Sequence, residues 1–172
     1  MDIKKKLKIL YEARIIFFKA LLAGYAGKSD KKDPRLTKTI SMFGFEKTNT
    51  YRYGNFIVVD RWTVSDHSNI SSGTTVILFV EVPVWIMTYS GSYPKNVIPF
   101  LKEALSEQYK TGEFRGGRGP YRWVSEKFLY RNNVHENEVN NFSCFSGHEE
   151  IVDQKTGKVL GFHEYSGMSM IE

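Results

Sequence analysis

The 172-residue sequence contains one cysteine, Cys144. A single cysteine excludes an intramolecular disulfide and any metal site built from cysteine alone. No apolar run approaches the ~20 residues that a membrane-spanning helix needs, and no signal peptide precedes the first helical pattern. We therefore expect a reduced, cytoplasmic protein that does not engage a membrane.

The motifs of common metal sites and hydrolases are missing as well. The four histidines, at positions 67, 135, 148 and 163, lack the short spacing of zinc or iron ligands. No Gly-x-Ser-x-Gly nucleophile elbow occurs. The sequence thus assigns no catalytic residue, no metal and no cofactor.

Aromatic residues are abundant, with 12 Phe, 10 Tyr and 3 Trp in a chain that is 41% hydrophobic. This composition is typical of a globular protein and excludes wholesale disorder. The length suits one domain, which we place at residues 1–172.

Positive charge is concentrated at the N-terminus. The net charge is +5, but residues 1–38 hold 11 Lys and Arg against 4 Asp and Glu. A solvated helix face with a lysine-rich loop over 28–38 accounts for this excess, and contact with a phosphate-bearing polymer is the alternative. Because no helix-turn-helix pattern or zinc-finger spacing is present, we do not expect direct nucleic-acid binding.

Hydrophobic periodicity divides the chain into helices and strands. Apolar residues at three- and four-residue steps predict helices over 3–24 and 96–105, with Asn96 as a cap and Pro99 in the first turn. Period-two and β-branched runs predict strands within 51–62, 74–82, 84–89, 121–130, 142–152 and 159–165.

The two halves of the chain resemble each other. The tripeptide YRY at 51–53 corresponds to YRW at 121–123, and YSG at 89–91 to YSG at 165–167. We therefore predict an α+β fold made of a duplicated helix-plus-three-strand unit, 1–91 and 92–172. Two helices would pack on one face of a curved antiparallel sheet, and the other face would be concave.

An ordered set of motifs carries a family resemblance. It comprises YAG at 25–27, PVWIMTY at 83–89, FLKEAL at 100–105, RGP at 118–120, FSGHEEI at 145–151 and YSG at 165–167. In this order the chain resembles an uncharacterised bacterial domain family whose members occur alone or behind an XRE-type helix-turn-helix module. The resemblance implies an association with transcription regulation, in which this domain senses a ligand or binds a partner.

Candidate binding residues fall on the strands and on one loop. The glycine- and arginine-rich segment 115–120 could hold an anion, and a carboxylate among strand aromatics suits a polar or cationic group. Trp and Tyr combine apolar bulk with a polar tip, as ligand pockets require. The predicted ligand-binding residues are Tyr51, Asp60, Trp62, Trp85, Tyr89, Arg115, Arg118, Trp123, Glu149, His163 and Tyr165.

The favoured interpretation is a non-catalytic module that senses or sequesters a small molecule, either an anion or a nucleotide-like compound. One alternative is a hydrolase or isomerase that uses Glu149 or Glu150 with His163 or Asp60 as the second group. The other is a protein–protein interaction module. A homodimer is compatible with all three.

Overall fold

The computed structural model of the protein describes residues 1–27, 33–135 and 141–171. Two helices, α1 (Ile3–Ala23) and α2 (Ile98–Thr111), and a short 3-10 turn, η1 (Lys95–Val97), accompany one large antiparallel sheet. Within these ranges the strands are β1 (Leu36–Ile40), β2 (Glu46–Tyr53), β3 (Phe56–Val64), β4 (Ile70–Phe79), β5 (Val82–Ser92), β6 (Arg122–Val124), β7 (Phe128–Val134), β8 (Cys144–Asp153) and β9 (Val159–Ser169).

The sheet order is β1-β2-β3-β4-β5-β9-β8-β7-β6, and neighbouring strands are antiparallel throughout. Strands that follow one another in sequence are paired, with one exception. Strand β6 is not a neighbour of β5, which pairs with β9 instead. That junction joins the strands before α2 to those after it, and it sets Tyr89 opposite Tyr165.

The predicted α+β fold with a duplicated helix-plus-three-strand unit is wrong. In the described part of the chain, five strands follow α1 and four follow α2, so the fold is mainly β. One added strand is β1, which lies in the stretch predicted as a loop over 28–38. Its sequence gives little hydrophobic signal because only Leu36 of its five residues is buried. Residues 28–32 of that predicted loop lie outside the described ranges.

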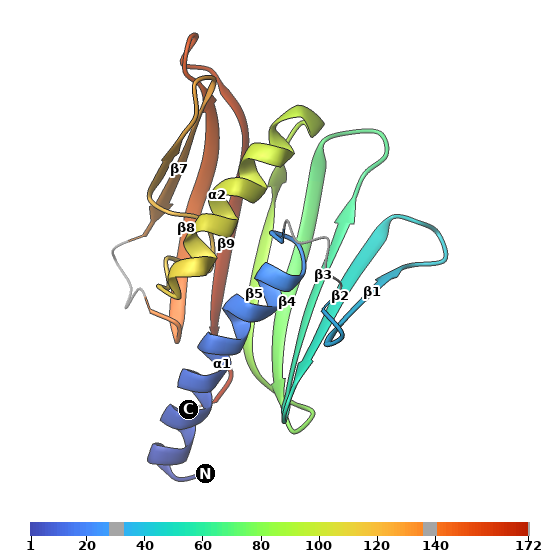
Figure 1. The fold of residues 1–172 in the computed structure, drawn as a ribbon, viewed down its shortest axis with the longest axis vertical. Coiled ribbons are helices and arrows are strands. Elements are labelled where there is room, and N and C mark those ends of the chain that lie inside the picture. The colour runs from blue at the N-terminus through green and yellow to red at the C-terminus, as the bar shows by residue number, and fades with distance from the viewer. Residues whose placement is uncertain (28–32, 136–140, 172) are drawn as a thin grey trace.

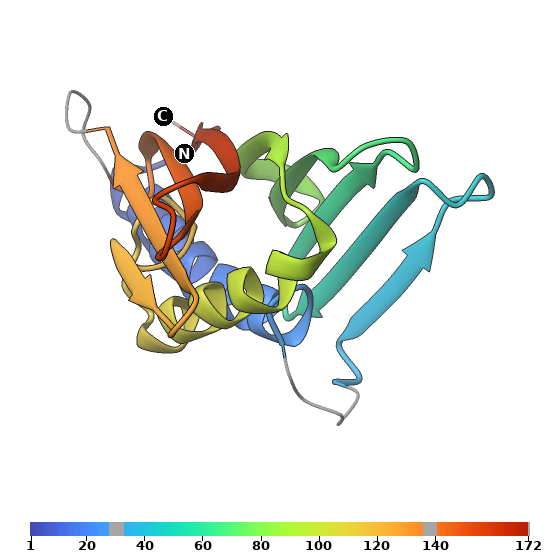
Figure 2. The same ribbon diagram turned by 90° about the horizontal axis from the view of Figure 1, so that it is seen from above.

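The sheet curls around the two helices, as Figures 1 and 2 show from two directions. Helix α1 contacts β2, β3, β4 and β5, and α2 contacts β7 and α1. The concave face is therefore the face that carries the helices, whereas the sequence analysis assigned the hollow to the opposite face. A strongly twisted sheet buries more apolar surface when it wraps its helices than when it stays flat.

Local backbone and capping contacts mark both ends of α1 and the end of α2. The Asp2 side chain accepts a hydrogen bond from the Lys4 amide (3.1 Å) at the start of α1, and the Gly24 amide donates to the Ala20 carbonyl (2.8 Å) at its end. Helix α2 ends at Gly112, whose φ of +69° favours glycine. Asn96, predicted to cap α2, lies instead within η1, so the regular helix starts two residues later.

No helix in the described ranges is long and apolar enough to cross a bilayer.

Aromatic rings fill the core between α1 and the sheet. Phe17 of α1 is fully buried and makes edge contacts with the rings of Trp85 (5.1 Å), Tyr109 (6.1 Å) and Phe142 (6.2 Å). The Trp85 indole stacks on Phe142 and donates its N–H to the Phe142 carbonyl (2.6 Å). Its polar atom is therefore satisfied inside the core, away from any ligand.

We expect Phe17→Ala to lower the free energy of unfolding by about 3–5 kcal/mol, because the surrounding rings cannot close the cavity it leaves. Urea denaturation measures this change. Tyr11→Ala on the same helix is the matched control, since Tyr11 is 65% exposed and its truncation should change stability by less than about 0.5 kcal/mol. Equal effects of the two substitutions would contradict this account of the core.

Candidate functional site

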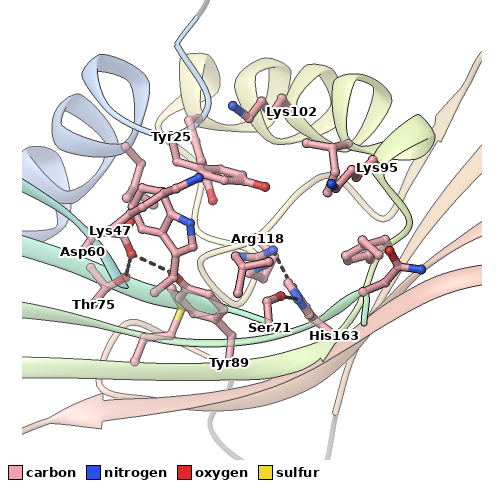
Figure 3. Close-up of a pocket in the computed structure, with 18 of the residues that line it drawn as sticks. Tyr25, Lys47, Asp60, Ser71, Thr75, Tyr89, Lys95, Lys102, Arg118 and His163 are labelled. Carbon is pink, nitrogen blue, oxygen red and sulfur yellow. Dashed lines mark hydrogen bonds between the residues drawn. The ribbon is translucent and has the colours of Figure 1, made fainter. Parts of the chain in front are cut away.

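A cavity of about 290 Å³ lies between the concave face of the sheet and the two helices (Figure 3). Polar and charged side chains converge on it from β2, β3, β4, β5 and β9, from α2, and from the segments that follow α1 and α2. Its lining consists of Leu21, Tyr25, Lys47, Asp60, Trp62, Val64, Ser68, Asn69, Ser71, Thr75, Met87, Tyr89, Tyr93, Lys95, Ile98, Lys102, Tyr109, Arg118 and His163.

Five of the residues predicted to bind a ligand line this cavity. They are Asp60, Trp62, Tyr89, Arg118 and His163. Four of them lie on strands, and the period of two places each on the concave face. Arg118 reaches the cavity from the loop between α2 and β6.

The other six predicted residues do not line the cavity. Tyr51 is buried beneath Arg35, whose guanidinium carbon lies 5.3 Å from the ring centroid, and Trp85 belongs to the core. Trp123 lies on the edge strand β6. Tyr165 donates a hydrogen bond to Asn132 Oδ1 (2.5 Å).

Arg115 and Glu149 are the remaining two of the six predicted residues that do not line the cavity. The Arg115 guanidinium lies over the Tyr121 ring (4.4 Å to the centroid) and pairs with Glu113 (2.8 Å). Glu149 is fully buried beneath the cavity floor. The glycine-rich segment therefore supplies one side chain, Arg118, to the cavity.

The floor rests on an ion pair between Arg118, which lines the cavity, and Glu149 beneath it. Arg118 Nη2 donates to Glu149 Oε1, and the Tyr130 hydroxyl donates to Glu149 Oε2 (2.6 Å). The side chains of Arg118 and Glu149 are 6% and 0% exposed. Burial alone would raise the pKa of Glu149, but Arg118 and His163 outweigh it and lower that pKa to about 2.

Backbone and amide contacts hold the arginine loop against the sheet. Asn132 Nδ2 donates to the carbonyls of Arg115 (3.1 Å) and Gly119 (2.8 Å). The Gly119 amide donates to the Tyr130 hydroxyl (2.9 Å). A side chain at Gly119 would overlap the Tyr130 ring, so glycine is required there. These contacts hold Arg118 in place before any ligand arrives.

His163 and Ser71 meet across a glycine. The His163 ring lies with Nε2 3.1 Å from Ser71 Oγ, and its Nδ1 is 3.3 Å from Arg118 Nη2 and 3.4 Å from Glu149 Oε1. Gly91 of β5 lies between these strands, and a Cβ there would come within 2.7 Å of the imidazole. Burial, with Arg118 adding to it, lowers the pKa of His163, so the ring is neutral at neutral pH.

Asp60 is the second buried carboxylate. Its Oδ1 accepts hydrogen bonds from Thr75 Oγ1 and from the Tyr89 hydroxyl, both at 3.0 Å. The Tyr89 ring reaches Asp60 by lying over Gly73, where a Cβ would collide with it. Burial raises the pKa of Asp60, and the two hydroxyl donors and Arg118 oppose the shift. Among the described residues Oδ2 has no hydrogen-bond partner.

Lysines surround the mouth of the cavity (Figure 3). Lys47, Lys95 and Lys102 line it, and Lys102 Nζ lies 4.7 Å from the centroid of the Tyr25 ring. Burial, with smaller effects from Lys38 and Lys47, lowers the pKa of Lys102. Within the described ranges none of the three forms an ion pair with a carboxylate.

Sequence reasoning missed several lining residues, among them Tyr25, Lys47, Ser71, Thr75, Tyr93, Lys95 and Lys102. Thr75 could have been found, because it lies on the strand predicted over 74–82, whereas Ser71 precedes that predicted strand and belongs to β4 only in the structure. Tyr25 lies just past the end of α1, where no periodicity applies. The three lysines come from different elements, and only the tertiary fold brings them together.

No group of three or more acidic, histidine or cysteine side chains in the described residues has a geometry that would hold a metal ion.

Comparison with known proteins gives one family. The family model described as a domain of unknown function (DUF5680) matches residues 67–170. No curated protein and no solved structure matches the chain.

The low pKa of Glu149 predicts a loss of stability in acid. A carboxyl group whose folded pKa is about 2 stabilises the fold above its unfolded pKa of ~4.3, and this stabilisation disappears as the pH falls from about 5 to 2. We expect wild type to lose on the order of 3 kcal/mol through this group across that window. Glu149→Gln should start less stable and lose less.

Urea unfolding at pH 7, 5, 4 and 3 gives both curves. The difference in unfolding free energy between wild type and Glu149→Gln should shrink as the pH falls. Glu164→Gln is a control, because Glu164 is exposed. A constant difference across the series would contradict an ionised, buried Glu149.

Proposed function

The chain belongs to the DUF5680 family, whose function is unknown, and we propose that it binds a small organic anion in the cavity described above. In this proposal the protein senses or sequesters its ligand. The aromatic walls hold the organic body of the ligand, and cationic side chains hold its charge.

The observation that carries the proposal is the combination of tyrosine and tryptophan walls with three lysines at the mouth that have no carboxylate partner among the described residues. Like charges held together repel one another, and a half-buried ammonium group is also partly desolvated. The Tyr25 ring gives the Lys102 ammonium a cation–π contact, but no carboxylate in the described ranges pairs with it, and its pKa is lowered by burial and by neighbouring lysines. An anion at the mouth would offset both, and it would bind more weakly as salt is added.

The volume of the cavity suits a small ligand. About 290 Å³ lies at the lower end of the range for binding pockets, ~300–1,000 Å³. The wall side chains also provide polar tips, since Tyr25 and Tyr93 line the cavity beside Asp60 and Arg118. A ligand with one ring system and one anionic group would fill this space.

The cellular setting is part of the proposal. The resemblance to domains that accompany XRE-type modules in bacterial regulators supports a sensing role linked to transcription. Cytoplasmic location and homodimer formation remain predictions.

Lys102→Gln tests the anion site. We expect a ligand found by thermal-shift screening of nucleoside monophosphates, aryl phosphates and aryl carboxylates to bind this variant roughly ten-fold more weakly. Isothermal titration calorimetry measures the affinity, and the wild-type affinity should fall with rising salt.

Lys110→Gln is the matched control on the same helix. Lys110 pairs with Glu107 (2.5 Å) and does not line the cavity, so its replacement should leave affinity unchanged. If no anion in the panel binds, or if both variants bind like wild type, the proposed function is wrong.

A specific contact favours hydrolysis as the second candidate. Ser71 and His163 line the cavity and are hydrogen-bonded, and His163 adjoins the ionised Glu149. A serine, a neutral imidazole and a carboxylate in this order could activate a nucleophile if Nδ1 carries the imidazole proton. The competing contact of Nδ1 with Arg118 favours the other tautomer, in which His163 donates to Ser71. We therefore rank binding first.

Labelling with a fluorophosphonate probe separates the two candidates. Ser71 Oγ would attack the phosphorus, fluoride would leave, and His163 would take up the hydroxyl proton. Mass spectrometry should then find the adduct on Ser71 and lose it in Ser71→Ala, with Ser72→Ala as the control on the opposite face of β4. An unlabelled wild type excludes this hydrolase.

A further inference from the structure

Charge is unevenly distributed along the cavity. The mouth carries Lys47, Lys95 and Lys102, three positive charges without a carboxylate partner in the described ranges. In the interior, Arg118 is neutralised by Glu149, and His163 is neutral. Asp60 adds a carboxyl group that forms no ion pair with any described residue, although the charge of Arg118 acts on it. An anionic group is therefore favoured at the mouth and not at the deep end.

The deep end retains unused hydrogen-bonding capacity. Asp60 is 5% exposed, and its Oδ2 has no partner among the described residues. Arg118 is also 5% exposed, and its Nε has none either. Both side chains adjoin the Tyr89 ring, since Tyr89 donates to Asp60 and lies 5.2 Å from the Arg118 guanidinium carbon. A buried acceptor and a buried donor thus lie on either side of one ring.

Aromatic side chains line the space between the mouth and the deep end. Tyr25 and Trp62 meet edge to face at 5.6 Å between centroids, and both line the cavity. Lys102 lies over the Tyr25 ring, so the same residue adjoins the lysine mouth. A flat ring system is the shape that such walls accept.

The glycine-rich loop is not the phosphate site. Its Gly119 amide donates a hydrogen bond to the Tyr130 hydroxyl. The Arg115 guanidinium pairs with Glu113 and lies over the Tyr121 ring. This leaves the lysines of β2, η1 and α2 as the phosphate ligands.

We propose that the cavity binds a nucleoside monophosphate, with the phosphate at Lys47, Lys95 and Lys102 and the base at the deep end. The base donates a ring or exocyclic N–H to Asp60 Oδ2 and offers an acceptor to Arg118. A nucleobase carries both a hydrogen-bond donor and an acceptor, the two kinds of group that Asp60 and Arg118 would recognise. The inference rests on the proposed function, because it identifies the organic anion for the same cavity.

Calorimetric titration of the full chain with AMP, GMP, CMP and UMP tests the proposal. At least one should bind about ten-fold or more tightly than its own nucleoside and than inorganic phosphate. Asp60→Asn should weaken that nucleotide by about ten-fold or more but leave phenyl phosphate unchanged, because phenyl phosphate lacks an N–H. Asp153→Asn, in the turn after β8, is the control and should bind like wild type.

A methylated nucleotide tests the same hydrogen bond to Asp60 without changing the protein. If the best binder is UMP or GMP, its analogue methylated at the ring N–H should bind wild type about ten-fold more weakly. For AMP or CMP the analogue is the one dimethylated at the exocyclic amine. This measurement keeps the proposal testable if Asp60→Asn does not fold, which circular dichroism would reveal.

The outcomes separate this inference from the proposed function. If aryl phosphates or carboxylates bind wild type and lose affinity in Lys102→Gln, but no nucleotide binds, the nucleotide is wrong and the anion site stands. Nucleotide binding that is unaffected by Asp60→Asn and by methylation overturns the assigned orientation. If no anion binds at all, both proposals are wrong.

Discussion

The buried contact between Arg118 and Glu149 is the interaction on which the cavity depends. It joins the loop after α2 to β8, and it sets the charge of the floor. Burying two charges is costly unless both are well hydrogen-bonded, and breaking one such pair leaves an uncompensated charge in the interior. Here Tyr130 completes the coordination of the carboxylate, and Asn132 holds the loop. The floor is therefore held in place by the protein's own contacts, and a ligand of the proposed kind would meet a site that needs little further ordering.

Glycines on the concave face create the space that the site occupies. Tyr89 lies over Gly73, His163 adjoins Gly91, and Tyr165 lies over Gly147. In each case a large side chain leans across a neighbouring strand to a polar partner. The tyrosines of the YSG tripeptides at 89–91 and 165–167 thus share a local setting, because each lies opposite a glycine of the neighbouring strand, Gly73 or Gly147. Their similarity arises within a single nine-strand sheet of the described residues and does not require a repeated unit.

Sequence patterns predicted the parts of the structure that periodicity controls. Helix α1 ends at Ala23 against a predicted Gly24, and Asp60, Trp62, Tyr89 and His163, chosen as candidate binding residues, line the cavity. The polar strand β1 was missed because it buries only Leu36. Trp85 and Tyr51 were assigned to the ligand because composition cannot separate a core aromatic from a wall aromatic. Likewise, nothing local indicates that Lys47 and Lys102, 55 positions apart in the sequence, border one opening.

The region matched by the family, 67–170, begins after β3. It contains Arg118 and Glu149, which form the ion pair at the base of the cavity, and the hydrogen-bonded side chains of His163 and Ser71. Tyr25, Lys47, Asp60 and Trp62 come from the segment before it. The base of the cavity thus comes from the matched stretch, whereas part of its wall comes from the stretch before it. A protein that kept residues equivalent to 67–170 but differed in the segment before them would keep the base of the cavity. Its cavity wall would differ, and the wall would suit a different ligand.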